Sequence, residues 1–265
     1  MRKNSLLILD YQGNFADDFS VIAYAKIMKK QNKNLKYFYE NKTLKRSKFE
    51  EYMSNFNLDF DSDFDYISSK KVKDVAQKSY FLNNLFLKNE KLFNKYVKNN
   101  VLSKTHFEIN DIEFISNEIK SMFSFKTFEF VKNYDILDEI YSHSSIGVFV
   151  SKDDELTNDD LEFISNSLNR LNKFLKQPKL FIFSKNKNIK IDTYIEYEIV
   201  DLLDWREEFY FLSLCRHHIV LDTKNSYSKN LWASIISKRD YCYTLYKKSK
   251  NIDTKKMHNW LFVWF

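Results

Sequence analysis

The stretch Ile146-Gly147-Val148-Phe149-Val150 is an apolar run of strand length, and it decides the fold class of this chain. A helical pattern follows it, with Thr157 or Asn158 as the capping residue. The apolar side of that pattern consists of Leu161, Ile164, Leu168, Leu171 and Leu175. Pro178, the only proline, ends the pattern, and Leu180–Phe183 is the next apolar run. Strand, helix and strand in this order predict a βαβ unit with parallel strands.

The same alternation extends in both directions. Tyr194–Val200 and Ile219–Leu221 have strand character, and Glu207–Cys215 and Leu231–Ile236 have helical spacing. Nearer the N-terminus, the strand candidates 5–9 and 35–39 flank a helical segment, and residues 49–141 have mostly helical spacing. We therefore predict an α/β protein with βαβ units and a parallel sheet.

Composition and charge exclude several classes of protein. The 265 residues, 44% of them hydrophobic, suffice for one large or two small domains. No apolar stretch approaches the roughly 18 residues of a membrane span, and Leu6–Leu9 is too short for a signal peptide. Cys215 and Cys242 cannot form a disulfide framework, so we expect a cytoplasmic protein with structural cysteines. The net charge of +6 reflects a Lys- and Asn-rich composition and comes without any nucleic-acid motif, so no nucleic-acid partner is predicted.

Polar segments follow four of the predicted strands, and they form the candidate site because parallel sheets bind ligands beyond the carboxyl ends of their strands. Their notable residues are Gly13, Asn14, Asp17, Asp18, Ser151, Lys152, Asp154, Ser184, Lys185, Asn186, Asn225, Ser226 and Ser228. A lysine such as Lys152 can pair with a diphosphate, and Asp154 can hold or deprotonate a hydroxyl. Each segment alone also fits a solvated loop or a helix cap.

Three stretches resemble the bacterial α-1,2-fucosyltransferases. Glu207–Val220, read as EEFYFLSLCRHHIV, is similar to that family's E-D-[FL]-x-L-M-S-L-C-K-H-N-I-I segment almost position for position. Pro178–Asn186 resembles its P-x-F-F-I-F-S-D-D, with Lys185 and Asn186 in place of the two acids. Gly13–Met28 aligns without gaps with its glycine-rich opening, where Asp17 and Asp18 replace an Asn-Gln pair.

The family's donor signature, V-H-I-R-R-G-D, corresponds here to Val148–Asp154. Phe149 stands in place of the His and Ser151 in place of the first Arg, whereas Lys152 keeps a positive charge and Asp154 keeps the acid. Arg and Lys are not interchangeable where a phosphate is bound by two parallel hydrogen bonds. The closing N-S-[ST]-F-S-W-W-G-A segment matches 225–228 with a gap, and Lys229-Asn230 replace its Trp pair.

The resemblance implies a GT-B-like fold, in which two Rossmann-type halves face a cleft. The first half, 1–143, is then the acceptor side, the second half, 144–240, binds the nucleotide, and a basic and aromatic segment, 241–265, follows. It implies a metal-independent, inverting glycosyltransferase of surface polysaccharide or lipopolysaccharide synthesis, with a GDP-sugar as first guess for the donor. The acceptor is then a glycan or a lipid-linked saccharide. The alternative is a catalytically silent relative that acts as a binding or scaffolding partner.

Position and motif match also imply roles for individual residues. Lys152 would neutralise the diphosphate leaving group, and Asp154 or Asp17 would bind or deprotonate the acceptor, with Asp18 on the acceptor side. The expected donor-binding residues are Gly13, Asn14, Ser151, Ser184, Lys185, Asn186, His217, Asn225, Ser226 and Ser228.

Three further features admit more than one interpretation. The acidic run 59–65 fails as a calcium loop, since it has no Gly at the sixth position and Lys70 stands where the bidentate acid belongs, and no metal is predicted. His217 and His218 would point to opposite faces of a strand and so cannot share a metal; a structural role competes with donor binding.

The C-terminal aromatics from Trp260 onwards follow several lysines, and we expect them to pack back on the protein, with a peripheral contact at the inner face of the cytoplasmic membrane as the alternative.

Overall fold

A computed structural model describes residues 5–9, 16, 19, 22–23, 35–39, 51–58, 120–223, 225–237 and 243–246. The chain divides into two compact units, Met1–Lys126 and Thr127–Phe265, each of which is described by itself. Within the described ranges, no helix is long and apolar enough to cross a membrane.

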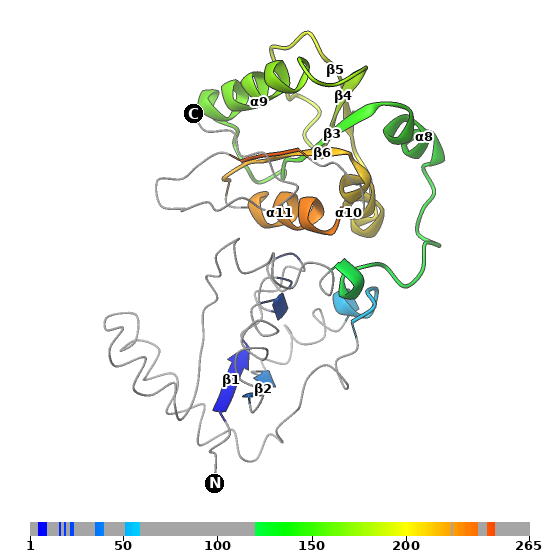
Figure 1. The fold of residues 1–265 in the computed structure, drawn as a ribbon, viewed down its shortest axis with the longest axis vertical. Helices are drawn as coiled ribbons and strands as arrows, with labels where there is room; N and C mark the ends of the chain where they lie inside the picture. Colours follow the sequence, from blue (N-terminus) through cyan, green and yellow to red (C-terminus); the bar gives the residue numbers. More distant parts are fainter. Residues whose placement is uncertain are drawn as a thin grey trace, which may run out of the picture. The chain divides into compact units, whose positions relative to one another are not determined.

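The second unit is built around a five-stranded sheet (Figure 1). All its strands are parallel, in the order β5-β4-β3-β6-β7. In chain order the elements are α8 (Tyr134–Ser142), β3 (Ser144–Phe149), α9 (Asn158–Leu171), β4 (Pro178–Phe183), β5 (Glu196–Val200), α10 (Trp205–Leu214), β6 (His217–Val220), α11 (Tyr227–Ile236) and β7 (Thr244–Tyr246). The chain adds β4 and β5 on one side of β3 and then crosses over to add β6 and β7 on the other. The predicted α/β class with a parallel sheet is confirmed.

One face of this sheet is apolar and is covered by helix α9 (Figure 1). Successive side chains of a strand alternate between faces, so Ile146, Val148, Leu180 and Ile182 all point to this side. They form one buried cluster with the α9 residues Phe163, Ile164, Leu168 and Leu171 and with Ile219, Leu221 and Leu245. Each such side chain contributes roughly 1.5–3 kcal/mol when it leaves water.

A capping box starts helix α9. The Thr157 hydroxyl accepts a hydrogen bond from the Asp160 backbone N–H at 3.2 Å, and the Asp160 carboxylate accepts one from the Thr157 N–H at 3.0 Å. Two of the N–H groups at this helix start that lack helical partners are satisfied in this way. Thr157, one of the two predicted caps, is therefore the capping residue.

The opposite face packs against α10 and α11 (Figure 1), and Gly147 of β3 is the point of closest approach. A Cβ atom added at Gly147 would lie 2.9 Å from the Cβ of Cys215 and 3.0 Å from Leu212 Cδ1. A residue without a side chain is therefore required where the end of α10 crosses the strand. Cys215 is buried and forms no disulfide.

In the first unit, β1 (Ser5–Leu9) and β2 (Leu35–Tyr39) pair in parallel. Both strands coincide with the predicted ones. A small aromatic core lies in the same unit, where the Phe19 ring stacks on Phe123 at 3.8 Å and meets Phe56 edge-on at 4.8 Å. The 51–58 and 120–126 segments are tied together by an antiparallel bridge between Phe56 and Phe125.

Some boundaries differ from those predicted. Helix α9 ends at Leu171, and Pro178 is the first residue of β4 rather than the end of the helical stretch. A strand start tolerates proline because its missing N–H is not needed there. Between the two elements, Gln177 has φ 49°, a left-handed conformation.

Helix α11 begins at Tyr227, earlier than the predicted Leu231, so Ser228 belongs to its first turn. Helix α8, which the sequence-based division placed before residue 143, is part of the second unit. Strand β7, in the predicted segment 241–265, is part of the second unit's sheet.

Candidate functional site

The carboxyl ends of β3 and β6 mark the point where the order of strands reverses around β3. Doubly wound sheets bind their ligands at such a switch point. The loop after β3 carries Ser151, Lys152 and Asp154, and the loop after β6 carries Asn225 and Ser226. The structure thus brings five of the predicted site residues to one place.

The Asp154 carboxylate joins the two loops. One of its oxygens accepts hydrogen bonds from the Thr223 hydroxyl at 2.8 Å and from the Ser226 hydroxyl at 2.5 Å. The other accepts from the Asn225 side-chain amide at 2.8 Å and from the Asn225 backbone N–H at 3.2 Å. All four of these hydrogen bonds come from the loop after β6, so the Asp154 carboxylate holds the two loops together.

Ser226 and Asn230 tie the start of α11 to the end of β3. The buried Ser226 hydroxyl accepts a hydrogen bond from the Ser151 N–H at 2.8 Å. The Asn230 side-chain amide donates to the Phe149 carbonyl at 2.8 Å, and its oxygen accepts from the Phe149 N–H at 2.6 Å. Asn230 therefore satisfies both backbone groups of Phe149, as a neighbouring strand would.

The two predicted lysines, Lys152 and Lys185, are exposed, unlike the buried Ser226 and Asn230. In the loop after β4, the buried Ser184 hydroxyl accepts a hydrogen bond from the Asn186 N–H at 3.0 Å. The Asn186 side-chain oxygen in turn accepts from the Asn188 N–H at 3.0 Å. Ser184 and Asn186 thus shape the loop that carries Lys185.

A buried ion pair that the sequence analysis did not single out lies beside this region. Lys229, in the first turn of α11, pairs with Glu208 in the first turn of α10, and both side chains are buried. The Lys229 ammonium also lies 3.8 Å from the centre of the Phe149 ring. Burial lowers the pKa of Lys229, and the opposing effect of Glu208 does not fully compensate. Lys229 and Asn230 stand where the family motif has its Trp pair, and both are buried.

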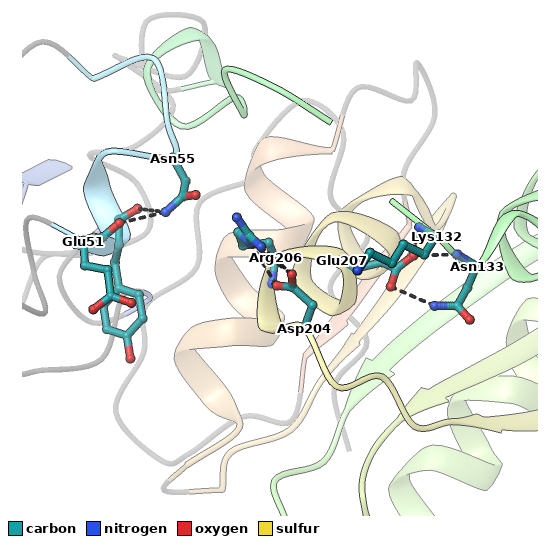
Figure 2. Close-up of polar contacts among 8 residues, drawn as sticks. Glu51, Asn55, Lys132, Asn133, Asp204, Arg206 and Glu207 are labelled. Atoms are coloured by element: carbon teal, nitrogen blue, oxygen red, sulfur yellow. Dashed lines mark hydrogen bonds and ion pairs between the residues drawn. The ribbon is translucent and has the colours of Figure 1, made fainter. Parts of the chain in front are cut away.

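Glu207, at the start of the best-matching stretch, has a role in holding the chain. Its buried carboxylate accepts hydrogen bonds from the backbone N–H groups of Lys132 and Asn133 at 2.6 and 2.7 Å (Figure 2). The other oxygen accepts from the Asn133 side-chain amide at 2.8 Å. Next to it, Asp204 caps α10 and pairs with Arg206. The residues that carry the resemblance here stabilise the fold.

His217, predicted to bind the donor, lies away from the switch point. It is the first residue of β6, so about three residue steps of roughly 3.3 Å separate it from the carboxyl end of that strand. Its Nδ1 accepts a hydrogen bond from the Tyr243 N–H at 3.1 Å, and its ring stacks on Tyr243. Burial, together with nearby Arg216, lowers the pKa of His217 to about 4. Burial and then His217 lower the pKa of His218 to about 3.

Other predicted features lie outside the described residues, namely Gly13, Asn14, Asp17 and Asp18, the acidic run 59–65 and the aromatic C-terminus from Trp260 onwards. Among the described residues, no group of three or more His, Cys, Asp or Glu side chains is arranged to hold a metal ion. Comparisons of the chain with protein-family models, with curated proteins and with solved structures find no match.

Proposed function

We propose that this chain is a nucleotide-sugar-dependent, fucosyltransferase-like glycosyltransferase with a GT-B arrangement of two Rossmann-type halves. The observation that carries the proposal is the gathering of Ser151, Lys152 and Asp154 with Asn225 and Ser226 at the switch point of a parallel sheet. The resemblance of Glu207–Val220 and Pro178–Asn186 to the α-1,2-fucosyltransferases supports the reaction class.

In the proposed reaction, a hydroxyl of a glycan or lipid-linked saccharide attacks the anomeric carbon of the donor. The bond from that carbon to the diphosphate breaks, with inversion, and the nucleoside diphosphate leaves with the bonding electron pair. Lys152, exposed at the end of β3, is positioned to neutralise the charge that develops on the diphosphate. The acceptor proton goes to a carboxylate, for which Asp17 or Asp18 is the candidate.

Asp154 acts in this scheme as a positioning residue. Its carboxylate already accepts four hydrogen bonds from Thr223, Asn225 and Ser226, and these hold the loop after β3 against the loop after β6. By fixing the loop after β3, it holds the neighbouring Lys152 at the edge of the sheet.

The test is a thermal-shift panel of GDP-, UDP-, CMP- and dTDP-sugars. We expect one donor to raise Tm, since a ligand at about 100 times its Kd stabilises the folded state by about 2.7 kcal/mol. In Lys152→Ala the shift should shrink and the transfer rate should fall. Lys173→Ala is the matched control, because Lys173 is an equally exposed lysine beyond the opposite end of α9. An unchanged shift and rate in Lys152→Ala would remove the assignment of Lys152.

The silent relative is the second candidate, and two observations favour it. Phe149 and Ser151 stand where the family has its His and first Arg. The Asn225 N–H and the Ser226 hydroxyl, two donors just before α11, already bind the Asp154 carboxylate. A panel in which no nucleotide sugar changes Tm would support this candidate and overturn the transferase.

A further inference from the structure

Strands β3 and β6 stop pairing with each other before either strand ends. β3 pairs with β4 along its whole length. Its register with β6 ends at the pair Gly147–His218, although β3 continues to Phe149 and β6 to Val220. Across these described residues, the two central strands are therefore unpaired at their carboxyl ends, where the candidate site lies.

Side chains of α11 take the place of β6 along the end of β3. The Phe149 N–H donates to the Asn230 side-chain oxygen at 2.6 Å. The Ser151 N–H donates to the Ser226 hydroxyl at 2.8 Å. Between them, the Val150 N–H donates in the other direction, to a carbonyl of β4 at 3.0 Å. Successive N–H groups thus alternate between two neighbours, as they do inside a sheet, but one of the neighbours is a helix.

The Asn230 amide has both groups that this role requires. Its nitrogen donates to the Phe149 carbonyl at 2.8 Å, so one side chain satisfies the donor and the acceptor of the same residue. An amide carries an acceptor oxygen and a donor nitrogen, whereas an ionised aspartate has no donor and a leucine has neither group. The side chain is buried, and its nitrogen also donates to the Ser226 carbonyl at 3.1 Å. The amide is therefore held in one orientation by its own helix.

The end of β3 leads directly to the candidate cation. Lys152 is exposed and follows Ser151 in the chain. Ser151 is bound on both sides, because its N–H donates to Ser226 and its carbonyl accepts from the Asp154 N–H at 3.1 Å. The course of β3 up to Ser151 therefore decides where the Lys152 side chain starts.

From these contacts we infer that Asn230 is a positioning residue, which stands in for β6 and sets the direction in which β3 leads to Lys152. Asn230 acts through the backbone of Phe149 and does not itself bind the ligand. The inference rests on the proposed function only in giving Lys152 a diphosphate to bind. The anchoring of β3 by α11 depends on the hydrogen bonds alone.

Amide hydrogen exchange on the full chain, read residue by residue, tests the anchoring. In the wild-type chain, Phe149 and Ser151 should be as protected as Val150, because side chains of α11 replace a neighbouring strand. Fast exchange at both Phe149 and Ser151 would overturn the inference without any variant.

Asn230→Ala removes the acceptor of the Phe149 N–H, so exchange at Phe149 should become about tenfold faster or more. Exchange at Val150, whose N–H is bound to β4, should change much less. Unchanged exchange at Phe149 would overturn the inference. Equal acceleration at Phe149 and Val150 would also overturn it, because Asn230 would then support the whole strand rather than its end.

Two further variants separate hydrogen bonding from packing. Asn230→Asp keeps an acceptor oxygen, so the Phe149 N–H should stay protected. Asn230→Leu fills the space with an apolar group and should behave as Asn230→Ala. Wild-type protection of Phe149 in Asn230→Leu would show that the side chain only fills space. Asn169→Ala, which changes an exposed asparagine of α9, is the matched control and should alter neither amide.

Calorimetric titration with inorganic pyrophosphate tests the link to Lys152. Lys152→Ala should weaken pyrophosphate binding by about tenfold, and Asn230→Ala should weaken it by a smaller factor. The double variant should bind no more weakly than Lys152→Ala alone, because Asn230 acts only through the placement of Lys152. Effects that multiply in the double variant would overturn the positioning role, and so would a wild-type chain that does not bind pyrophosphate. Pyrophosphate binding without a Tm shift from any nucleotide sugar would overturn the proposed function and leave this inference standing.

Discussion

The two faces of the five-stranded sheet use the same strands but different chemistry. Towards α9, the strands present a continuous apolar cluster around Val148 and Ile182. Towards α10 and α11, the packing includes a buried ion pair, Glu208–Lys229, the buried His218 and the Asn230 amide. The apolar face gains stability from burial alone, whereas on the other face Glu208, Lys229 and Asn230 are paired, which reduces the desolvation cost of burying them. The comparison shows that specific polar contacts hold α10 and α11 against the strands that lead to the site, whereas the apolar cluster stabilises the sheet by burial.

The largest effect is expected from breaking the buried pair. Glu208→Ala leaves the Lys229 ammonium buried without its carboxylate and should lower the free energy of unfolding by about 3–5 kcal/mol. Chemical denaturation measures this loss. The double variant Glu208→Met/Lys229→Met should recover most of it, since apolar residues of similar volume need no partner. A single variant within about 1 kcal/mol of wild type would show that the pair is solvated.

The pH dependence of the free energy of unfolding reports on the two buried histidines, His217 and His218. The folded-state pKa values of His217 and His218, about 4 and about 3, lie below the ordinary value of 6.5, so the unfolded chain binds more protons between these limits. The free energy of unfolding should therefore fall as the pH falls, by about 2 kcal/mol for each histidine between pH 7 and pH 5.

Denaturation of variants at both pH values checks this slope. His218→Leu should make the slope shallower, because it removes the histidine whose folded-state pKa is about 3. An unchanged slope in both His218→Leu and His217→Gln would contradict the assignment.

Neighbouring residues of β3 allow a direct comparison of the faces. Gly147→Ala places a Cβ against Cys215 and Leu212 and should cost about 1–3 kcal/mol by overpacking. Ile146→Val, on the α9 face, removes one methylene group and should cost about 0.5–1.5 kcal/mol. Urea titrations of both variants rank the faces, and a Gly147→Ala protein as stable as wild type would show that α10 can shift.

The smallest effect concerns the start of α9. Thr157→Ala removes the hydroxyl half of the capping box and should cost about 1 kcal/mol. Thr157→Ser keeps the hydroxyl and serves as the control. Thermal unfolding of the two variants should differ by a few degrees, and equal Tm values would indicate that the Asp160 carboxylate alone is sufficient.

The sequence could predict the apolar face well, because alternation and helical spacing leave a direct pattern in the residues. The strands 5–9 and 35–39 coincide with those observed, and Ile164, Leu168 and Leu171 are buried as predicted. It could not predict that Glu207, Glu208 and Lys229 are buried, since charged residues at these positions fit a solvated helix surface equally well. Their partners lie tens of residues away, and only the fold brings them together.

The proximity of the candidate residues could be predicted in part. The switch point follows from the order of strands and helices, so the sequence predicts that Ser151, Asp154 and Ser226 lie at one edge of the sheet, where their hydrogen bonds bring them together. Asp154 binds the loop after β6 because of the directions that side chains take within two loops. Such directions leave no periodic pattern in the sequence. Strand β6 begins at His217, two residues before the predicted start at Ile219. The sequence therefore did not indicate that His217 lies at the amino end of this strand.

Gln177 connects the scarcity of glycine in this chain to its folded state. The chain contains only two glycines. The turn before β4 needs a left-handed residue, and there a glutamine takes the conformation at φ 49°. An L-residue with a side chain adopts it at a cost of roughly 1–2 kcal/mol. The turn before β4 therefore stores backbone strain at Gln177, and the apolar cluster beneath α9 provides the stability that tolerates it.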